Sequence, residues 1–215
     1  TKFFLKLKPR SKILYFPKKL VINSREFESK YGRHNLENLS IAVLVAQKMG
    51  VSLASIKKAI KNLPQIKYRQ EVIYQKNNIK VVNDSTATSP DATIVALERF
   101  SKESEIILIA GGTDKNLEFG KWAKMVKKYV KPENLFLLNS SATKKMILAL
   151  NKIDYFKKTR RILFEDFMKL LRAVKSLVKV KQRIILFSPG AASFEKFKNE
   201  FDRGKKFNLY WKLAV

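Results

Sequence analysis

The feature that most constrains the fold is an alternation of short, wholly apolar runs with helical segments between residues 66 and 215. Residues 106–109 and 184–187 are apolar at every position, not at every second one. A strand that is apolar on both sides is buried on both faces, which is typical of a parallel sheet covered by helices. The alternation therefore predicts an α/β fold with a doubly wound, mostly parallel sheet.

The individual elements of this region follow from the same pattern. The expected strands cover residues 72–74, 79–82, 105–110, 134–138, 161–164 and 183–187. The expected helices cover residues 90–100, 119–130, 142–150, 166–178 and a segment from Ser193 onward. Asn77 and Asn78 separate the first two strands, and such a pair favours the tight turn of a β-hairpin.

Residues 1–65 follow a different pattern and are expected to form a smaller leading piece. Apolar-rich runs at residues 3–7, 13–16 and 20–22 predict short strands without a core of their own. Helical spacing then predicts one helix over residues 35–49 and a second that begins after Ser52 and ends before Pro64. We therefore expect a boundary between residues 65 and 66.

The composition excludes several classes of protein. The chain has no cysteine, which rules out disulfides and cysteine metal sites and fits a reducing compartment. It has one histidine, His34, so a zinc site is not expected. No run of about 18 apolar residues is present, so no membrane span is expected, and the cytoplasm is the expected location.

The formal net charge of +27 raises nucleic acid as a partner. However, 35 of the 45 basic residues are lysines and only 10 are arginines, the residues that read base edges and bind phosphate in a bidentate manner. The sequence contains no aromatic-interleaved RNA motif and no zinc-finger spacing. We therefore expect a lysine-rich surface and no specific nucleic-acid site.

Three polar loops each follow a strand and precede a helix, at residues 83–90, 111–115 and 188–193. In doubly wound sheets such loops meet at one edge, where ligands bind. Gly111 and Gly112 allow close backbone approach, and Lys115 adds a cation, although an ordinary tight turn explains the same residues.

The other two loops also leave alternatives open. Residues 188–193 offer hydroxyl and N–H groups for a carboxylate, but Ser193 also suits a helix N-cap. Asp84 suits a magnesium ion, an adenine or a ribose group, but also an Asx-turn. The chain contains no G-x-x-x-x-G-K-[ST] and no G-x-G-x-x-G motif. The residues alone therefore predict an anion-binding α/β domain.

Five segments, taken in order, resemble the Mur ligase family and especially its D-glutamate-adding member. The resemblance runs from Gly32 to the end of the chain. Its segments are Gly32-Arg33-His34-Asn35 with Asn38, Tyr68-Arg69-Gln70-Glu71, Asn83-Asp84-Ser85-Thr86-Ala87-Thr88, Gly111-Gly112-Thr113-Asp114-Lys115, and Ser188-Pro189-Gly190-Ala191-Ala192-Ser193-Phe194 with Phe197-Lys198-Asn199 and Arg203-Gly204.

The resemblance implies a ligase that uses ATP and Mg²⁺ to form an acyl phosphate on UDP-N-acetylmuramoyl-L-alanine, which the amino group of D-glutamate then attacks during peptidoglycan precursor synthesis. Residues 66–215 would be its C-terminal Rossmann-like amino-acid-binding domain, and residues 1–65 the tail of its central ATP-binding domain. A monomer is expected. The matching positions imply that the adenine and ribose of ATP are held by Asn38, Arg69 and Asp84, and the D-glutamate carboxylates by Thr88, Lys115 and Ser193.

The resemblance assigns no catalytic residue and no metal ligand to this chain. The family's phosphate loop lies upstream of the matching region, so the 215 residues alone are expected to be inactive. The chain departs from many family members at Tyr68 (usually His), at Thr86 (usually Lys) and at Glu200-Phe201, where the usual aromatic-then-acid order is reversed. The alternative is a stand-alone, non-catalytic α/β module that binds an acidic small molecule or partner.

Overall fold

The computed structural model describes residues 27–28, 31–32, 35–157, 162–177 and 183–213. The chain divides into two compact units, Thr1–Gln65 and Ile66–Val215. The strands expected within residues 3–22 lie outside the described residues, as does His34. Within the described part of the chain, no helix is long and apolar enough to cross a membrane.

The leading unit contains helices α3 (Leu36–Lys48) and α4 (Leu53–Lys61), which confirm the two helices expected there. Gly50 follows α3 with a φ of +84°, and the Ser52 side chain accepts a hydrogen bond from Ser55 N at 3.2 Å at the start of α4. A small apolar cluster holds the helices together, formed by Phe27, Tyr31, Leu36, Leu39, Val43 and Ile56.

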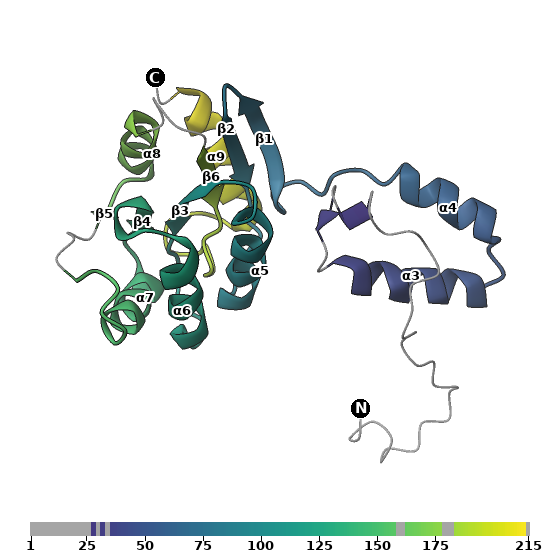
Figure 1. Cartoon of the computed structure of the whole chain (residues 1–215), viewed down its shortest axis with the longest axis horizontal. Helices are drawn as coiled ribbons and strands as arrows, with labels where there is room; N and C mark the ends of the chain where they lie inside the picture. Colours follow the sequence, from purple (N-terminus) through teal and green to yellow (C-terminus); the bar gives the residue numbers. More distant parts are fainter. Residues whose placement is uncertain (1–26, 29–30, 33–34, 158–161, 178–182, 214–215) are drawn as a thin grey trace, which may run out of the picture. The chain divides into compact units, whose positions relative to one another are not determined.

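The second unit is built on a six-stranded sheet (Figure 1). Its strands in chain order are β1 (Glu71–Lys76), β2 (Ile79–Asn83), β3 (Glu105–Ala110), β4 (Leu135–Leu138), β5 (Ile162–Phe164) and β6 (Arg183–Phe187). The spatial order is β1-β2-β6-β3-β4-β5, and every neighbouring pair is parallel except β1 and β2, which form the expected hairpin. Asn77 and Asn78 form its turn with φ values of +50° and +63°.

Helices cover both faces of this sheet (Figure 1). Helices α5 (Pro90–Phe100), α6 (Gly120–Tyr129) and α7 (Ser141–Asn151) pack on one face, and α8 (Phe167–Ser176) and α9 (Glu200–Leu213) pack on the other. Along β3, Ile106 and Leu108 point into the first core and Ile107 and Ile109 into the second. Each continuous apolar run thus serves two cores, which confirms the doubly wound α/β prediction.

One expected helix boundary is wrong. The last helix begins at Glu200, not near Ser193, and the side chain of Asn199 accepts a hydrogen bond from Asp202 N at 2.8 Å at its start. Ser193 is therefore not the N-cap of α9. Residues 193–197 form only a single turn, in which Phe197 N donates to Ser193 O at 3.0 Å, and the Glu195 side chain bonds to a neighbouring segment.

Candidate functional site

The three polar loops leave adjacent strands, because β6 lies between β2 and β3. Backbone hydrogen bonds continue past the ends of these strands: Asp84 N donates to Phe187 O at 2.8 Å, and Gly111 N donates to Pro189 O at 3.0 Å. The loops at residues 83–90, 111–115 and 188–193 therefore meet at one edge of the sheet, which we call the rim. The expected convergence is present.

The glycine pair at the rim serves close packing between loops. A Cβ on Gly112 would lie 2.2 Å from Ala192 O, and one on Gly111, whose φ is +120°, would lie 2.3 Å from Leu138 O. Thr113 and Ala192 form an isolated antiparallel bridge beside them. The backbone that approaches these glycines thus belongs to neighbouring segments of the protein.

The side chain of Arg203 lies at the centre of the rim and is 1% exposed. Its Nε and Nη2 donate to Ser85 Oγ (3.1 Å) and Ser85 O (2.7 Å), and its Nη1 donates to Ala191 O and Ala192 O, both at 3.0 Å. Burial lowers the pKa of Arg203 to about 10, so the guanidinium stays charged at neutral pH. Arg203 therefore links the loops after β2 and β6 and brings a buried positive charge to the rim.

Asp84 is 3% exposed and uses both carboxylate oxygens inside the protein. Oδ1 accepts a hydrogen bond from Gln70 N at 3.0 Å, and Oδ2 accepts one from Ser188 Oγ at 2.7 Å. Burial raises the pKa of Asp84 to about 7, against the opposing effects of these hydrogen bonds and of the Arg69 and Arg99 charges. Both oxygens of the Asp84 carboxylate are thus engaged within the protein, and among the described residues no group of three or more His, Cys, Asp or Glu side chains could hold a metal ion.

The residues expected to hold ATP lie in both units. Arg69 is exposed in the segment that Asp84 contacts through Gln70 N. Asn38 is exposed on α3 of the leading unit, where its Nδ2 donates to Asn35 Oδ1 at 3.2 Å. The α/β unit therefore brings together only Arg69 and Asp84 of this set.

The residues expected to hold D-glutamate lie on the three loops of the rim. Lys115 is exposed and makes no ion pair with any described residue. The adjacent Asp114 is already neutralised by Lys145 at 2.7 Å. Ser193 is 3% exposed, and its Oγ is buried without a hydrogen-bond partner within the described residues. Thr88 is half-buried in the loop after β2.

Glu195, which follows Ser193, connects the rim to a fourth loop, the one between β4 and α7. The sequence pattern gave no role to Glu195. Glu195 N donates to Thr113 Oγ1 at 2.8 Å, and the Glu195 carboxylate accepts hydrogen bonds from Ser141 N (3.0 Å) and Ser141 Oγ. The carboxylate thus lies at the N-terminus of α7, where a negative charge is favourable. Glu195 holds the Ser193 loop against the loop that carries Lys115.

Comparisons with known proteins place the chain beside a group of curated relatives. No protein-family model matches the chain. The chain is 36% identical over 187 residues to the UDP-N-acetylmuramoylalanine--D-glutamate ligase of Roseiflexus sp. (strain RS-1), covering 87% of this chain and 39% of the relative. It is 35% identical over 184 residues to the ligase of the same name from Prochlorococcus marinus (strain MIT 9312), covering 85% and 38%. The chain thus spans about two fifths of the length of these relatives.

Solved structures show the same fold at lower sequence identity. The UDP-N-acetylmuramate-alanine ligase MurC from Thermotoga maritima matches with a TM-score of 0.58 at 16% identity, over 85% of this chain and 39% of that chain. The MurF ligase from Thermotoga maritima, solved in complex with ADP, matches with a TM-score of 0.57 at 15% identity, over 85% and 38%. The matching region includes the doubly wound sheet and hence the strands that position the rim.

Proposed function

Because the chain belongs to the Mur ligase family, whose members it matches in their C-terminal portion, we propose that it is part of an ATP-dependent ligase that adds D-glutamate to UDP-N-acetylmuramoyl-L-alanine. The relatives above, at 35–36% identity, carry the name of that ligase. The complete enzyme would act in the cytoplasm, as a monomer, in the synthesis of peptidoglycan precursors.

This proposal rests on two side chains at the rim, the cation of Lys115 and the hydroxyl of Ser193. Neither of them pairs with a described residue. D-glutamate presents two carboxylates, which require a cation together with hydroxyl or amide donors. Lys115 supplies the cation, since Asp114 beside it is paired with Lys145. Ser193 supplies a buried hydroxyl that no described residue uses, and Thr88 supplies a second hydroxyl.

The role we propose for residues 66–215 is to hold the amino acid and orient its amino group. ATP would supply the phosphoryl group that activates the carboxylate of the precursor, and the upstream part of the enzyme would bind the phosphates. Asn38 and Arg69 would contact the adenine and ribose. Asp84 accepts two internal hydrogen bonds, so its contribution would be to fix the segment that carries Arg69. On this proposal residues 1–65 are the tail of the central ATP-binding domain, and the 215 residues alone do not catalyse the reaction.

The test is Lys115→Ala in the complete ligase. Removal of a charge-assisted hydrogen bond to a D-glutamate carboxylate should weaken D-glutamate binding by roughly 2 kcal/mol, which is about 30-fold in apparent affinity. The apparent affinity for ATP should change far less, because other residues hold the nucleotide. Steady-state kinetics, with each substrate varied in turn, measure both effects.

Lys121→Ala is the matched control, because Lys121 is also an exposed lysine but lies on α6. It should leave the D-glutamate response unchanged. If Lys115→Ala behaves like this control, the assignment of the D-glutamate site is wrong.

A further inference from the structure

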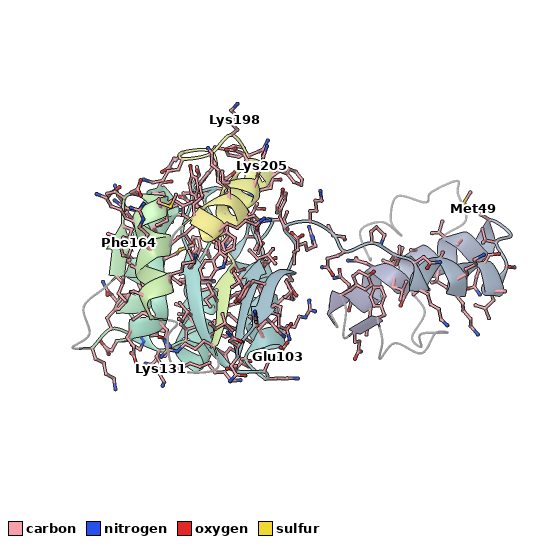
Figure 2. All side chains as sticks on the ribbon, turned by 90° about the horizontal axis from the view of Figure 1, so that it is seen from above. Met49, Glu103, Lys131, Phe164, Lys198 and Lys205 are labelled. Atoms are coloured by element: carbon pink, nitrogen blue, oxygen red, sulfur yellow. The ribbon has the colours of Figure 1, made fainter. Side chains whose placement is uncertain are left out.

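A pocket of about 350 Å³ lies at the opposite end of the sheet from the rim. Its walls are the β1–β2 turn, the loop after α5, and the first residues of β2 and β6: Gln75, Lys76, Asn77, Asn78, Ile79, Lys80, Glu103, Ser104, Arg183 and Ile184. Figure 2 shows Glu103 at this end of the α/β unit, together with Lys131, and Lys198 and Lys205 at the other end. At about 3.3 Å per residue, the length of β2 separates the pocket from the rim by roughly 13 Å.

The wall of the pocket includes two cations that form no salt bridge with a described residue. Glu103 pairs with Lys80, and the two side chains are 40% and 20% exposed. Glu105, which lies opposite Arg183 in the strand register, pairs with Lys131 at 3.0 Å and accepts a hydrogen bond from Asn134 at 2.8 Å. These two lysines thus occupy both carboxylates. Lys76 and Arg183 form no salt bridge with a described carboxylate, although Arg183, after Lys131, also helps to lower the pKa of Glu105.

Arg183 is positioned by the fold but incompletely hydrogen-bonded. Its backbone N donates to Asn78 O at 2.9 Å, and its Nη1 donates to Leu177 O at 3.3 Å. Its Nε is buried without a hydrogen-bond partner in the described part of the chain. A buried donor on a charged group is costly to leave unsatisfied, so the side chain of Arg183 would gain from a small shift that brings its guanidinium to an acceptor. The side chains of Gln75, Asn77 and Asn78 on the same wall can also donate hydrogen bonds.

We propose that this pocket binds a small anion that carries phosphate groups, at a site separate from the rim. Lys76 and Arg183 supply the charge, and the guanidinium of Arg183 supplies donors in the fork geometry that matches phosphate oxygens. The surrounding side-chain amides supply further donors. This proposal does not depend on the ligase activity, because the pocket lies at the opposite end of the sheet from the rim.

Titration of the full 215-residue chain with inorganic pyrophosphate tests the proposal. The amide chemical shifts of the protein would be followed at constant ionic strength, set with sodium chloride. The shifts should saturate and should concentrate at residues 75–80, 103–104 and 183–184. Arg183→Gln should weaken pyrophosphate binding at least tenfold. Lys76→Gln, at an exposed position that leaves the sheet intact, should weaken it several-fold.

Arg172→Gln is the matched control, because Arg172 is an exposed arginine on α8, outside the pocket wall. It should bind pyrophosphate as the parent chain does. Shifts that spread over the lysine-bearing helices without saturation would show non-specific counterion binding and overturn the proposal. So would shifts confined to the rim, or unchanged binding by both Arg183→Gln and Lys76→Gln.

Discussion

At the scale of single residues, Asp84 shows how the rim combines burial with polar contacts. Its carboxylate is removed from water but accepts only two hydrogen bonds from described residues, from Gln70 N and Ser188 Oγ. Desolvation of the charged form outweighs these contacts and the nearby arginines, which leaves the pKa at about 7. The Asp84 carboxylate therefore links the segment around Arg69 to the loop after β6.

The raised pKa of Asp84 predicts a stability that depends on pH. Between its ordinary value of 3.8 and about 7, the folded protein keeps a proton on Asp84 that the unfolded chain has released. The free energy of unfolding therefore falls as pH rises through this window, by at most about 4 kcal/mol at about 1.4 kcal/mol per pKa unit. Asp84→Asn removes this titration. Urea unfolding at several values between pH 4 and pH 8 should show that the parent loses stability relative to the variant as pH rises.

The exposed Asp91, in the first turn of α5, provides the control Asp91→Asn. Its stability should change with pH in parallel with that of the parent. A constant difference between the parent and Asp84→Asn across the range would show that folding does not raise the pKa of Asp84.

At the scale of elements, the loop after β3 depends on the absence of a side chain at Gly112. A Cβ there would meet the backbone oxygen of Ala192 at 2.2 Å, and Ala192 is itself held by Thr113 and Arg203. Gly112→Ala must therefore displace one of the two loops. We expect a decrease of about 1–3 kcal/mol in the free energy of unfolding, as for other overpacked sites. Urea unfolding midpoints measure this decrease.

Gly120→Ala is the matched control. Gly120 is the first residue of α6, and a Cβ there would meet nothing within 4 Å. Its stability should stay within about 0.5 kcal/mol of the parent. Equal unfolding midpoints for the two alanine variants would mean that the loops can separate without cost.

Most elements could be predicted because their patterns are local. The strands β3 and β6 are continuous apolar runs, and Asn77 with Asn78 marks the hairpin turn. The start of α9 could not be predicted, since Ser193 and Asn199 are both good helix caps and the segment between them makes contacts distant in sequence, such as that of Glu195 with Ser141 54 residues earlier. The insertion of β6 between β2 and β3 likewise depends on long-range pairing.

The candidate site likewise has parts that could be predicted from the sequence and parts that could not. Its loops could be found because polar residues follow buried strands, and the resemblance then supplied Thr88, Lys115 and Ser193. Glu195 and Arg203 could not be assigned roles, because a glutamate and an arginine near a helix start are usually solvent-exposed. Their roles come from contacts with loops that are distant in sequence.

At the scale of the whole molecule, two residues that depart from the family pattern, Tyr68 and Thr86, contact each other where the chain enters the α/β unit. Thr86 N and Thr86 Oγ1 donate to Tyr68 O at 3.0 and 2.9 Å. Tyr68 and Gln70 have φ values of +60° and +46°, and Arg99 Nη1 donates to Gln70 Oε1 at 2.9 Å. The stretch from Tyr68 to Gln70 is therefore fixed to the α/β unit, and Thr86 has a structural role where many members have a lysine.

The net charge of +27 predicts binding to nucleic acid that depends on salt and not on sequence. The lysines are dispersed over exposed helix faces, as on α6 with Lys121, Lys124, Lys127 and Lys128. Lysines dispersed in this way neutralise phosphates and release counterions but do not read base edges. Fluorescence anisotropy with two oligonucleotides of equal length and different sequence should give equal affinities at about 50 mM salt. Both affinities should fall at least tenfold by about 200 mM salt.

The double variant Lys121→Gln/Lys124→Gln tests whether the charge is dispersed. Each lysine that neutralises a phosphate contributes about 1 to the slope of log affinity against log salt, so replacing two should reduce the slope by no more than about 2. Abolished binding in this variant would show a focused site on α6. Binding that survives physiological salt and distinguishes the two oligonucleotides would contradict the prediction, because a dispersed field of lysines attracts every phosphate backbone alike.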